Sequence, residues 1–330
     1  MATRGMIKVL RIQISFMLLL IGISTTCFAQ LGGRPGSFSR LGFGARGIGM
    51  GNALTAVTTG DVVGYYNPAL SPWAAYRNIS ASFGILSLDR NLNFISYAQP
   101  LAPRAGLSAG IINAGVSDID GRDSDGEQTG PLKTSENLIF MSFANRFQSG
   151  FTIGITIKLL YYHLYTDVST TTVGIDVGLL MPVSNALTLA ATIRDINSKY
   201  QWDTSELYGQ SGNTTKEKFP MLYTLGAAYK LPDLFGAGDT NAVIAADLEL
   251  SDQKTLIGRV GVELPLIPEI SLRAGLDRID LKEKGNGVKP SFGFSARQDF
   301  GNWTPALHYT FVLEAFSPSP THIVSLSVIF

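Results

Sequence analysis

Residues 151–162 read FTIGITIKLLYY, and every second side chain from Phe151 to Tyr161 is large and apolar. The positions between them hold threonine, glycine and lysine as far as Lys158, and then Leu160. Successive side chains of a β-strand point to opposite faces, so this pattern predicts a strand with one face suited to lipid and one suited to water. Residues 172–181, TVGIDVGLLM, repeat the pattern with Asp176 on the polar side. Both stretches therefore have the alternation of a transmembrane β-strand.

The same alternation recurs from about residue 78 to the last residue of the chain. It gives about 14 strands of roughly 9–15 residues, close to the length that crosses a bilayer as a tilted strand. An even strand count returns both ends of a barrel to one side of the membrane. The long connections near residues 117–134, 197–219 and 279–288 then all lie on the opposite side. The sequence therefore predicts an all-β fold, an antiparallel transmembrane β-barrel of about 14 strands.

A soluble sandwich of two sheets is the alternative, because its strands also alternate. Its polar face would be exposed to water and rich in lysine and glutamate, whereas here that face carries mainly glycine, threonine and serine with scattered charges of both signs. If the polar face lines a lumen, those charges can pair across it. The expected lumen charge network comprises Lys158, Asp176, Arg194, Asp247, Glu249, Arg259, Glu263, Arg273 and Asp277.

The beginning of the chain indicates export. Three basic residues precede an apolar run at residues 12–23 and a short polar stretch that ends at Ala29, so residues 1–29 read as a signal peptide. Cleavage after Ala29 removes the single cysteine and three basic residues, which leaves an excess of about three acidic charges. No basic stripe suggests a nucleic-acid partner.

The end of the chain, THIVSLSVIF at residues 321–330, alternates as a strand and finishes on Phe330. It resembles the closing strand of bacterial outer-membrane barrels. This resemblance implies that Phe330 is a signal for the barrel-assembly machinery and that the protein is integral to the outer membrane, with the lipid bilayer around it.

Residues 41–69, LGFGARGIGMGNALTAVTTGDVVGYYNPA, are unusually rich in glycine. A dinucleotide-binding loop needs a G-x-G-x-x-G motif between a buried strand and a helix, and neither the spacing nor the context fits. Glycine also lets the backbone turn sharply and approach other strands closely. We therefore expect residues 30–76 to fold inside the barrel of residues 77–330. Arg46 can then pair with a carboxylate of the lumen face, and an exposed surface arginine is the alternative.

The segment closely resembles the N-terminal hatch of FadL-like outer-membrane barrels, and within them the PorV/PorQ family. The matching hatch-motif residues are Gly44, Arg46, Gly47, Gly49, Gly51, Asn67 and Pro68. The resemblance implies a hatch that plugs the lumen. It also implies either of two functions, a PorV-like role or a FadL-like role.

In the PorV-like role, the protein is a partner of the type IX secretion system and binds secretion subunits or cargo C-terminal domains at its extracellular side. In the FadL-like role, it transports small hydrophobic molecules across the outer membrane. A conduit for apolar molecules should be lined with apolar side chains. The mixed charges expected in the lumen therefore favour the first role and leave the second as the alternative.

The sequence does not suggest an enzyme, a cofactor or a metal site. Its three histidines lack the G-x-S-x-G context of a serine hydrolase, and His308 reads as a member of the charge network. The acidic stretch at residues 118–127 fails the EF-hand register, because position six is Asp123 rather than glycine. An irregular calcium loop remains an alternative there to a solvated extracellular loop.

Overall fold

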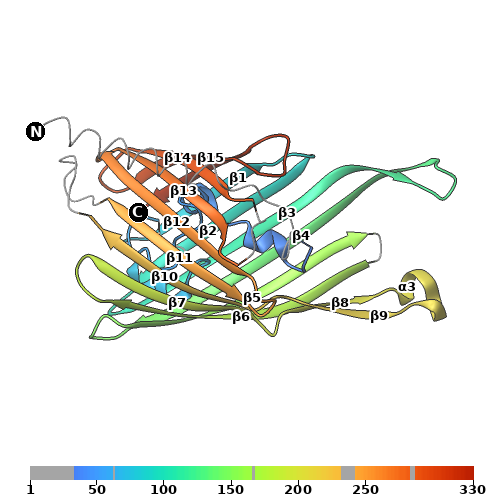
Figure 1. Cartoon of the computed structure of the whole chain (residues 1–330), viewed down its shortest axis with the longest axis horizontal. Coiled ribbons are helices and arrows are strands. Elements are labelled where there is room, and N and C mark those ends of the chain that lie inside the picture. The colour runs from blue at the N-terminus through green and yellow to red at the C-terminus, as the bar shows by residue number, and fades with distance from the viewer. Residues whose placement is uncertain (1–32, 62–63, 166–167, 232–241, 283–286) are drawn as a thin grey trace, which may run out of the picture.

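The structure, a computed structural model, describes residues 33–61, 64–165, 168–231, 242–282 and 287–330. Within these residues, 14 antiparallel strands form a closed barrel, whose long axis is horizontal in Figure 1, and the predicted architecture is thereby confirmed. The predicted signal peptide, residues 1–29, lies outside the described residues.

The barrel strands follow one another around the wall in chain order. They are β1 (Asn78–Ile85), β2 (Arg90–Leu101), β3 (Ala105–Arg122), β4 (Gln128–Arg146), β5 (Thr152–Tyr165), β6 (Val168–Pro182), β7 (Leu187–Ile196), β10 (Leu222–Lys230), β11 (Val243–Ser251), β12 (Leu256–Ile267), β13 (Ile270–Asp280), β14 (Lys289–Arg297), β15 (Thr304–Val312) and β16 (Thr321–Ile329). The ring closes where β1 pairs with β16, with Asn78 opposite Ile329.

The two rims of the barrel differ in the length of their connections. At one rim the backbone N–H of Phe330 donates to the carbonyl of Arg77 at 3.0 Å, and the short turns at residues 147–151 and 183–186 lie at the same rim. We call this rim the turn end. The opposite rim, the loop end, carries the long connection between β7 and β10 and the far end of the β3–β4 hairpin.

Two stretches predicted as long loops contain strands. Strands β3 and β4 are 18 and 19 residues long, so most of residues 117–134 belongs to a hairpin that projects beyond the rim (Figure 1). The connection between β7 and β10 contains β8 (Lys199–Asp203) and β9 (Thr214–Lys218), which pair only with each other. Every residue of β9 is exposed, so its sequence has no alternation that could predict a strand.

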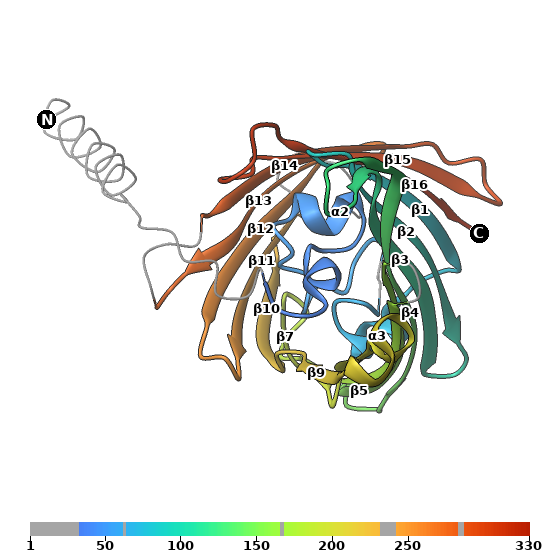
Figure 2. The ribbon, with the colours of Figure 1, turned by 90° about the vertical axis from the view of Figure 1, so that its right-hand side faces the viewer.

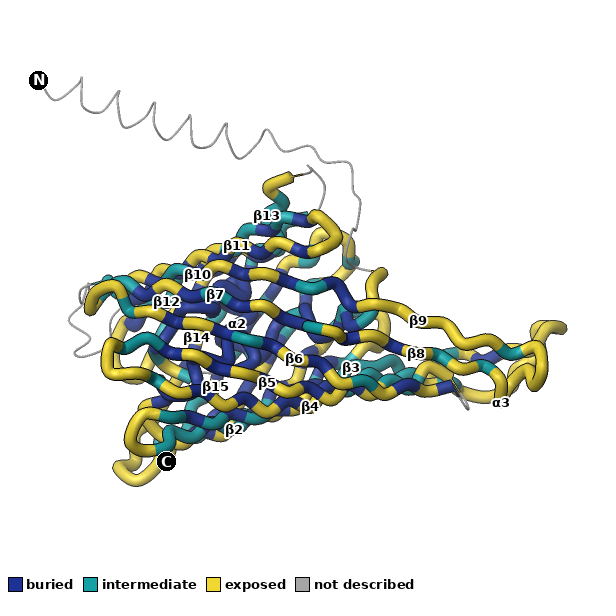
Figure 3. Tube along the Cα trace, turned by 90° about the horizontal axis from the view of Figure 1, so that it is seen from below, coloured by how far each residue is buried: buried dark blue, intermediate teal, exposed yellow. Residues whose placement is uncertain are grey.

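The barrel buries polar side chains and exposes apolar ones. In β5, Thr156 and Lys158 are 1% and 2% exposed, whereas Ile157 between them is 59% exposed. The alternation repeats around the wall, as the bands of Figure 3 show. An apolar outer surface and a polar interior fit a barrel that sits in lipid. No helix among the described residues is long and apolar enough to cross a membrane.

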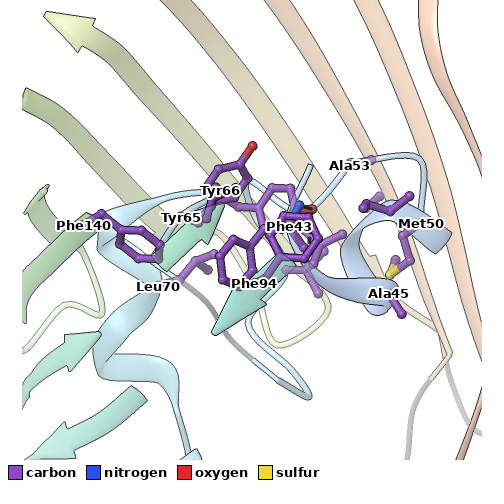
Figure 4. Packing of buried hydrophobic residues seen from close by; sticks show 14 of the residues in the cluster. Phe43, Ala45, Met50, Ala53, Tyr65, Tyr66, Leu70, Phe94 and Phe140 are labelled. Carbon is purple, nitrogen blue, oxygen red and sulfur yellow. Dashed lines mark hydrogen bonds between the residues drawn. The ribbon is translucent and has the colours of Figure 1, made fainter. Parts of the chain in front are cut away.

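The described part of the N-terminal segment, residues 33–61 and 64–76, lies inside the barrel (Figure 2). It contains the 3₁₀ helices η1 (Ser37–Arg40) and η2 (Pro68–Trp73) and the short helix α2 (Gly44–Gly49). Its aromatic residues Phe43 and Tyr65 pack against Phe94 and Phe140 of the wall (Figure 4), with ring centroids 5.0 Å apart for Phe43 and Phe94. The apolar core of the protein therefore lies where this segment meets strands β2 and β4.

Candidate functional site: the contact between the N-terminal segment and the wall

Helix α2 is held at both ends by hydroxyl groups of the wall. Ser325 of β16 accepts a hydrogen bond from the backbone N–H of Ala45 at 2.9 Å, and Thr310 of β15 donates to the Ala45 carbonyl at 2.6 Å. Ser291 of β14 donates to the Gly49 carbonyl at 3.2 Å. The bonds to the Ala45 N–H and the Gly49 carbonyl satisfy backbone groups that the ends of a helix leave unpaired. The sequence did not single out these hydroxyls, because serine and threonine are common all along the polar face.

Glycines allow the backbone of the segment to touch the backbone of the wall. Gly51, with φ of +60°, lies so close to β13 that an added Cβ would be 2.6 Å from the backbone nitrogen of Leu276. From the wall side, a Cβ on Gly275 would be 2.7 Å from the Cα of Gly51. Two glycines thus face each other where any side chain would force the segment away from β13.

The other glycines of the predicted hatch motif lie on α2. A Cβ on Gly47 would meet the side chain of Tyr66, and one on Gly49 would lie 2.7 Å from Thr310 Oγ1. Gly44 begins the helix with φ of +68°, and a Cβ there would have room. Gly44 is thus explained by its conformation and the other two by close packing.

Arg46 pairs with one wall carboxylate. Its Nη2 lies 2.6 Å from Glu263 Oε2, and Glu263 also accepts a hydrogen bond from Arg273 at 2.6 Å. Burial alone would lower the pKa of Arg46, but the charge of Glu263 raises it above its ordinary value. The guanidinium therefore stays charged, and β12 and β13 are tied to α2 through a single carboxylate.

Asp61, toward the far end of the glycine-rich stretch, contacts both Arg46 and the wall. Its Oδ2 lies 3.2 Å from His308 Nε2 in β15, and its backbone carbonyl accepts from Arg46 at 2.9 Å. Burial alone would raise the pKa of Asp61, but the hydrogen bond with His308 and nearby arginine charges lower it to about 2. Asp61 is therefore anionic at neutral pH.

Two polar side chains of the segment reach further wall carboxylates. Asn52 donates to Asp277 at 3.0 Å, while the hydroxyl of Thr55 donates to Asp247 at 2.6 Å. Asp277 also accepts from Arg259 at 2.8 Å, and Arg259 contacts Glu249 at 3.0 Å. The charged side chains of β11, β12 and β13 are therefore hydrogen-bonded to the segment through Asn52 and Thr55.

Asn67 and Pro68 lie against strands β5 and β6. The Asn67 amide donates to the Leu179 carbonyl at 3.1 Å, and its side-chain oxygen accepts from the Ala69 N–H at 2.9 Å, which starts η2. A Cβ on Gly154 would lie 2.5 Å from the carbonyl carbon of Pro68. This part of the motif therefore seats the end of the segment on the wall.

The remaining charges form a separate group. Lys158 contacts Asp176 at 2.7 Å and Asp195 at 2.8 Å, and all three residues are nearly fully buried. The guanidinium of Arg194 lies 4.8 Å from the ring centroid of Tyr65 and 3.9 Å from Asp176. Asp195 was not predicted, because it interrupts the alternation of β7 with φ of +60°. The nine predicted residues thus lie inside the barrel. Glu263 and Arg273 meet α2 through Arg46, whereas Arg259 meets Asn52 of the segment through Asp277.

Cavities lie at both ends of the segment. At the loop end, a small cavity of about 30 Å³ has apolar residues from both the segment and the wall. These are Leu41, Ile48, Leu86, Leu92, Val312 and Ile323, and the same cavity is bordered by the polar or charged residues Asn52, Asp277, Arg278, Lys289, Ser291, Glu314 and Thr321. At the turn end, a cavity of about 360 Å³ is bordered by Arg46, Asp61, Trp73 and Arg273. The segment lies between the two cavities and separates them.

The acidic loop does not gather around an ion-binding position. Asp123 accepts from the backbone N–H groups of Asp125 and Glu127, and Asp120 pairs with Arg122 at 2.7 Å. Across the ranges that the structure describes, no group of three or more acidic, histidine or cysteine side chains is placed to hold a metal ion.

No protein-family model and no curated protein sequence matches this chain. Solved structures do match. The toluene transporter TodX of Pseudomonas putida has a TM-score of 0.59 and 13% identity over 87% of this chain and 96% of its own. The CymD monoaromatic hydrocarbon channel has a TM-score of 0.61 and 13% identity, covering 88% of this chain and 98% of its own. A FadL homologue of Pseudomonas aeruginosa has a TM-score of 0.55 and 11% identity over the same shares.

At these identities the likeness is one of fold. The chain has the fold of a FadL-like outer-membrane β-barrel. One of these three neighbours is described as a transporter, one as a channel and one as a homologue of FadL.

Proposed function

We propose that the protein is an outer-membrane channel for small hydrophobic molecules, with the N-terminal segment as its hatch. The barrel spans the bilayer with the turn end in the periplasm and the loop end outside the cell. The fold is shared with proteins described as a toluene transporter and a monoaromatic hydrocarbon channel, which supports this reading over the PorV-like one.

The observation that carries the proposal is the partly apolar cavity at the loop end. Leu41 and Ile48 of the segment and Leu92 and Ile323 of the wall give this cavity apolar surface, beside charged groups such as Lys289 and Glu314. An apolar pocket with a few polar groups is typical of sites for small apolar ligands. A cavity of about 30 Å³ is smaller than an aromatic ring, so occupancy requires Leu41 or Ile48 to move.

The lumen charges do not argue against such a channel. Arg46, Arg259 and Arg273 each pair with a carboxylate, and much of the network is covered by the segment. The mixed charges therefore reflect how the segment is held, and they no longer favour a secretion partner. The hypothesis of a PorV-like role in type IX secretion rests on the sequence resemblance alone.

Uptake of radiolabelled toluene by intact cells tests the proposal. Leu86→Glu replaces an apolar lining residue with a carboxylate, and the cost of desolvating that charge beside the apolar side chains should slow uptake by roughly tenfold or more. Leu88→Glu is the matched control, because Leu88 is 74% exposed in the same turn and does not border the cavity.

Uptake is compared between variants and wild-type protein that are present at equal levels in the outer membrane. Wild-type uptake by the Leu86→Glu protein would contradict the proposal. Affinity purification of the wild-type protein separates the alternative, since secretion subunits or cargo domains bound at the loop end would support the PorV-like role.

A further inference from the structure

The base of the β8–β9 hairpin contacts the first turn of the N-terminal segment. Phe219, the residue after β9, is 3% exposed and packs over Gly36. A Cβ on Gly36 would lie 2.6 Å from Cδ1 of the Phe219 ring, closer than van der Waals contact allows. Gly36 also has φ of +68°, a conformation that favours glycine. The ring and the turn therefore fit together only because residue 36 has no side chain.

The barrel fixes the position of Phe219. Its N–H donates to the Ser198 carbonyl at 3.0 Å, which closes the hairpin base, and its ring lies 4.8 Å from that of Tyr200. Tyr200 and Trp202 in turn pack on Tyr162 of β5, with centroids 5.7 and 5.2 Å away. The aromatic cluster thus attaches the hairpin, which otherwise projects beyond the rim (Figure 1), to the wall.

The first turn of the segment is held differently from α2. The Ser39 N–H donates to the Gly36 carbonyl at 3.1 Å, the Leu41 N–H donates to the Phe38 carbonyl at 3.3 Å, and the Tyr65 hydroxyl donates to the Ser39 carbonyl at 2.6 Å. These bonds to the backbone of the turn stay within the segment, whereas α2 is bonded to three wall strands. The buried Arg40 of the turn is also attracted by the wall carboxylates Asp195 and Glu249. Packing by Phe219 on Gly36 adds a restraint on this turn from the barrel side.

We propose that the β8–β9 hairpin is a strap that holds the N-terminal end of the segment in place. When Phe219 leaves Gly36, residues 33–41 are released while α2 stays docked. Leu41 borders the loop-end cavity, so the strap also sets the size of that cavity. This last consequence rests on the proposed function, whereas the strap itself does not.

Hydrogen exchange of the full-length protein in detergent micelles tests the strap without any ligand. In Phe219→Ala, the amides of Ser39 and Leu41 should exchange at least about tenfold faster, because local opening exposes them. The amides of Met50 and Asn52, bonded at 3.1 and 2.9 Å within the docked part, should be unchanged. Tyr208→Ala is the control, since Tyr208 is 64% exposed at the hairpin tip.

A second pair of variants leaves the hairpin intact. Gly36→Ala should also speed exchange at Ser39 and Leu41, whereas Gly33→Ala should not, because nothing lies within 4 Å of a Cβ there. Unchanged exchange at Ser39 and Leu41 in both Phe219→Ala and Gly36→Ala would overturn the proposal. So would equal acceleration at Met50 and Asn52, since the contact would then hold the whole segment. Toluene uptake is a separate readout, so the two proposals can fail independently.

Discussion

At the scale of single residues, the segment is held by charges that meet specific wall partners. The sequence indicated that Arg46 could pair with any of five lumen carboxylates, and in the structure it contacts Glu263. Alternation predicts that a residue faces the lumen. It does not predict where along the barrel axis, or on which side of the lumen, the segment meets each strand. Those depend on register around the whole ring, which a single sequence does not show.

Asp61 makes one of these contacts dependent on pH. Its pKa falls from the ordinary 3.8 to about 2 in the folded protein, because the bond to His308 and nearby arginines outweigh burial. A lowered pKa means that the contact stabilises the docked segment above about pH 4 and is lost as the pH falls from about 4 to about 2. The contribution is on the order of 2 kcal/mol.

We expect channel openings in planar bilayers to become more frequent between about pH 4 and pH 2. Asp61→Asn should show frequent openings already at pH 7, because the anion is gone. Asp252→Asn, on an exposed residue at the loop end, should behave as the wild type. Closed channels at pH 7 in Asp61→Asn would show that this contact does not hold the segment.

At the scale of elements, strands were predictable and the structure inside the barrel was less so. Strands such as β5 and β6 combine strict alternation with β-branched residues, so local pattern and burial agree. Helix α2 contains three glycines in six residues, which disfavours a helix in isolation. It forms because wall hydroxyls bond its backbone and because glycine permits close approach.

The facing glycines of the segment and β13 give an element-scale prediction. Gly275→Val should push Gly51 off the wall, at a cost of about 1–3 kcal/mol typical of overpacking. Ala274→Val, the next residue on the same strand, is the control because Ala274 faces outward. We expect higher single-channel conductance only in Gly275→Val, and equal conductance in the two variants would argue against close packing at this position.

At the scale of the whole molecule, the strand number and the inward polar face followed from the sequence. The extent of the β3–β4 hairpin and the existence of β8–β9 did not, because these parts project from the rim where no lipid face imposes alternation. The hatch itself was expected from the glycine-rich stretch and its resemblance. Its bonds to the wall now define how it would close the lumen.

The central claim is that a lipid-spanning barrel is closed by its own N-terminal segment. Planar-bilayer recordings of the full-length protein and of a variant lacking residues 41–69 test it most directly. The account predicts a nearly silent wild-type channel and a large, stable conductance once the segment is removed, with the barrel still inserted. Identical conductance from the two proteins, at equal insertion, would contradict it.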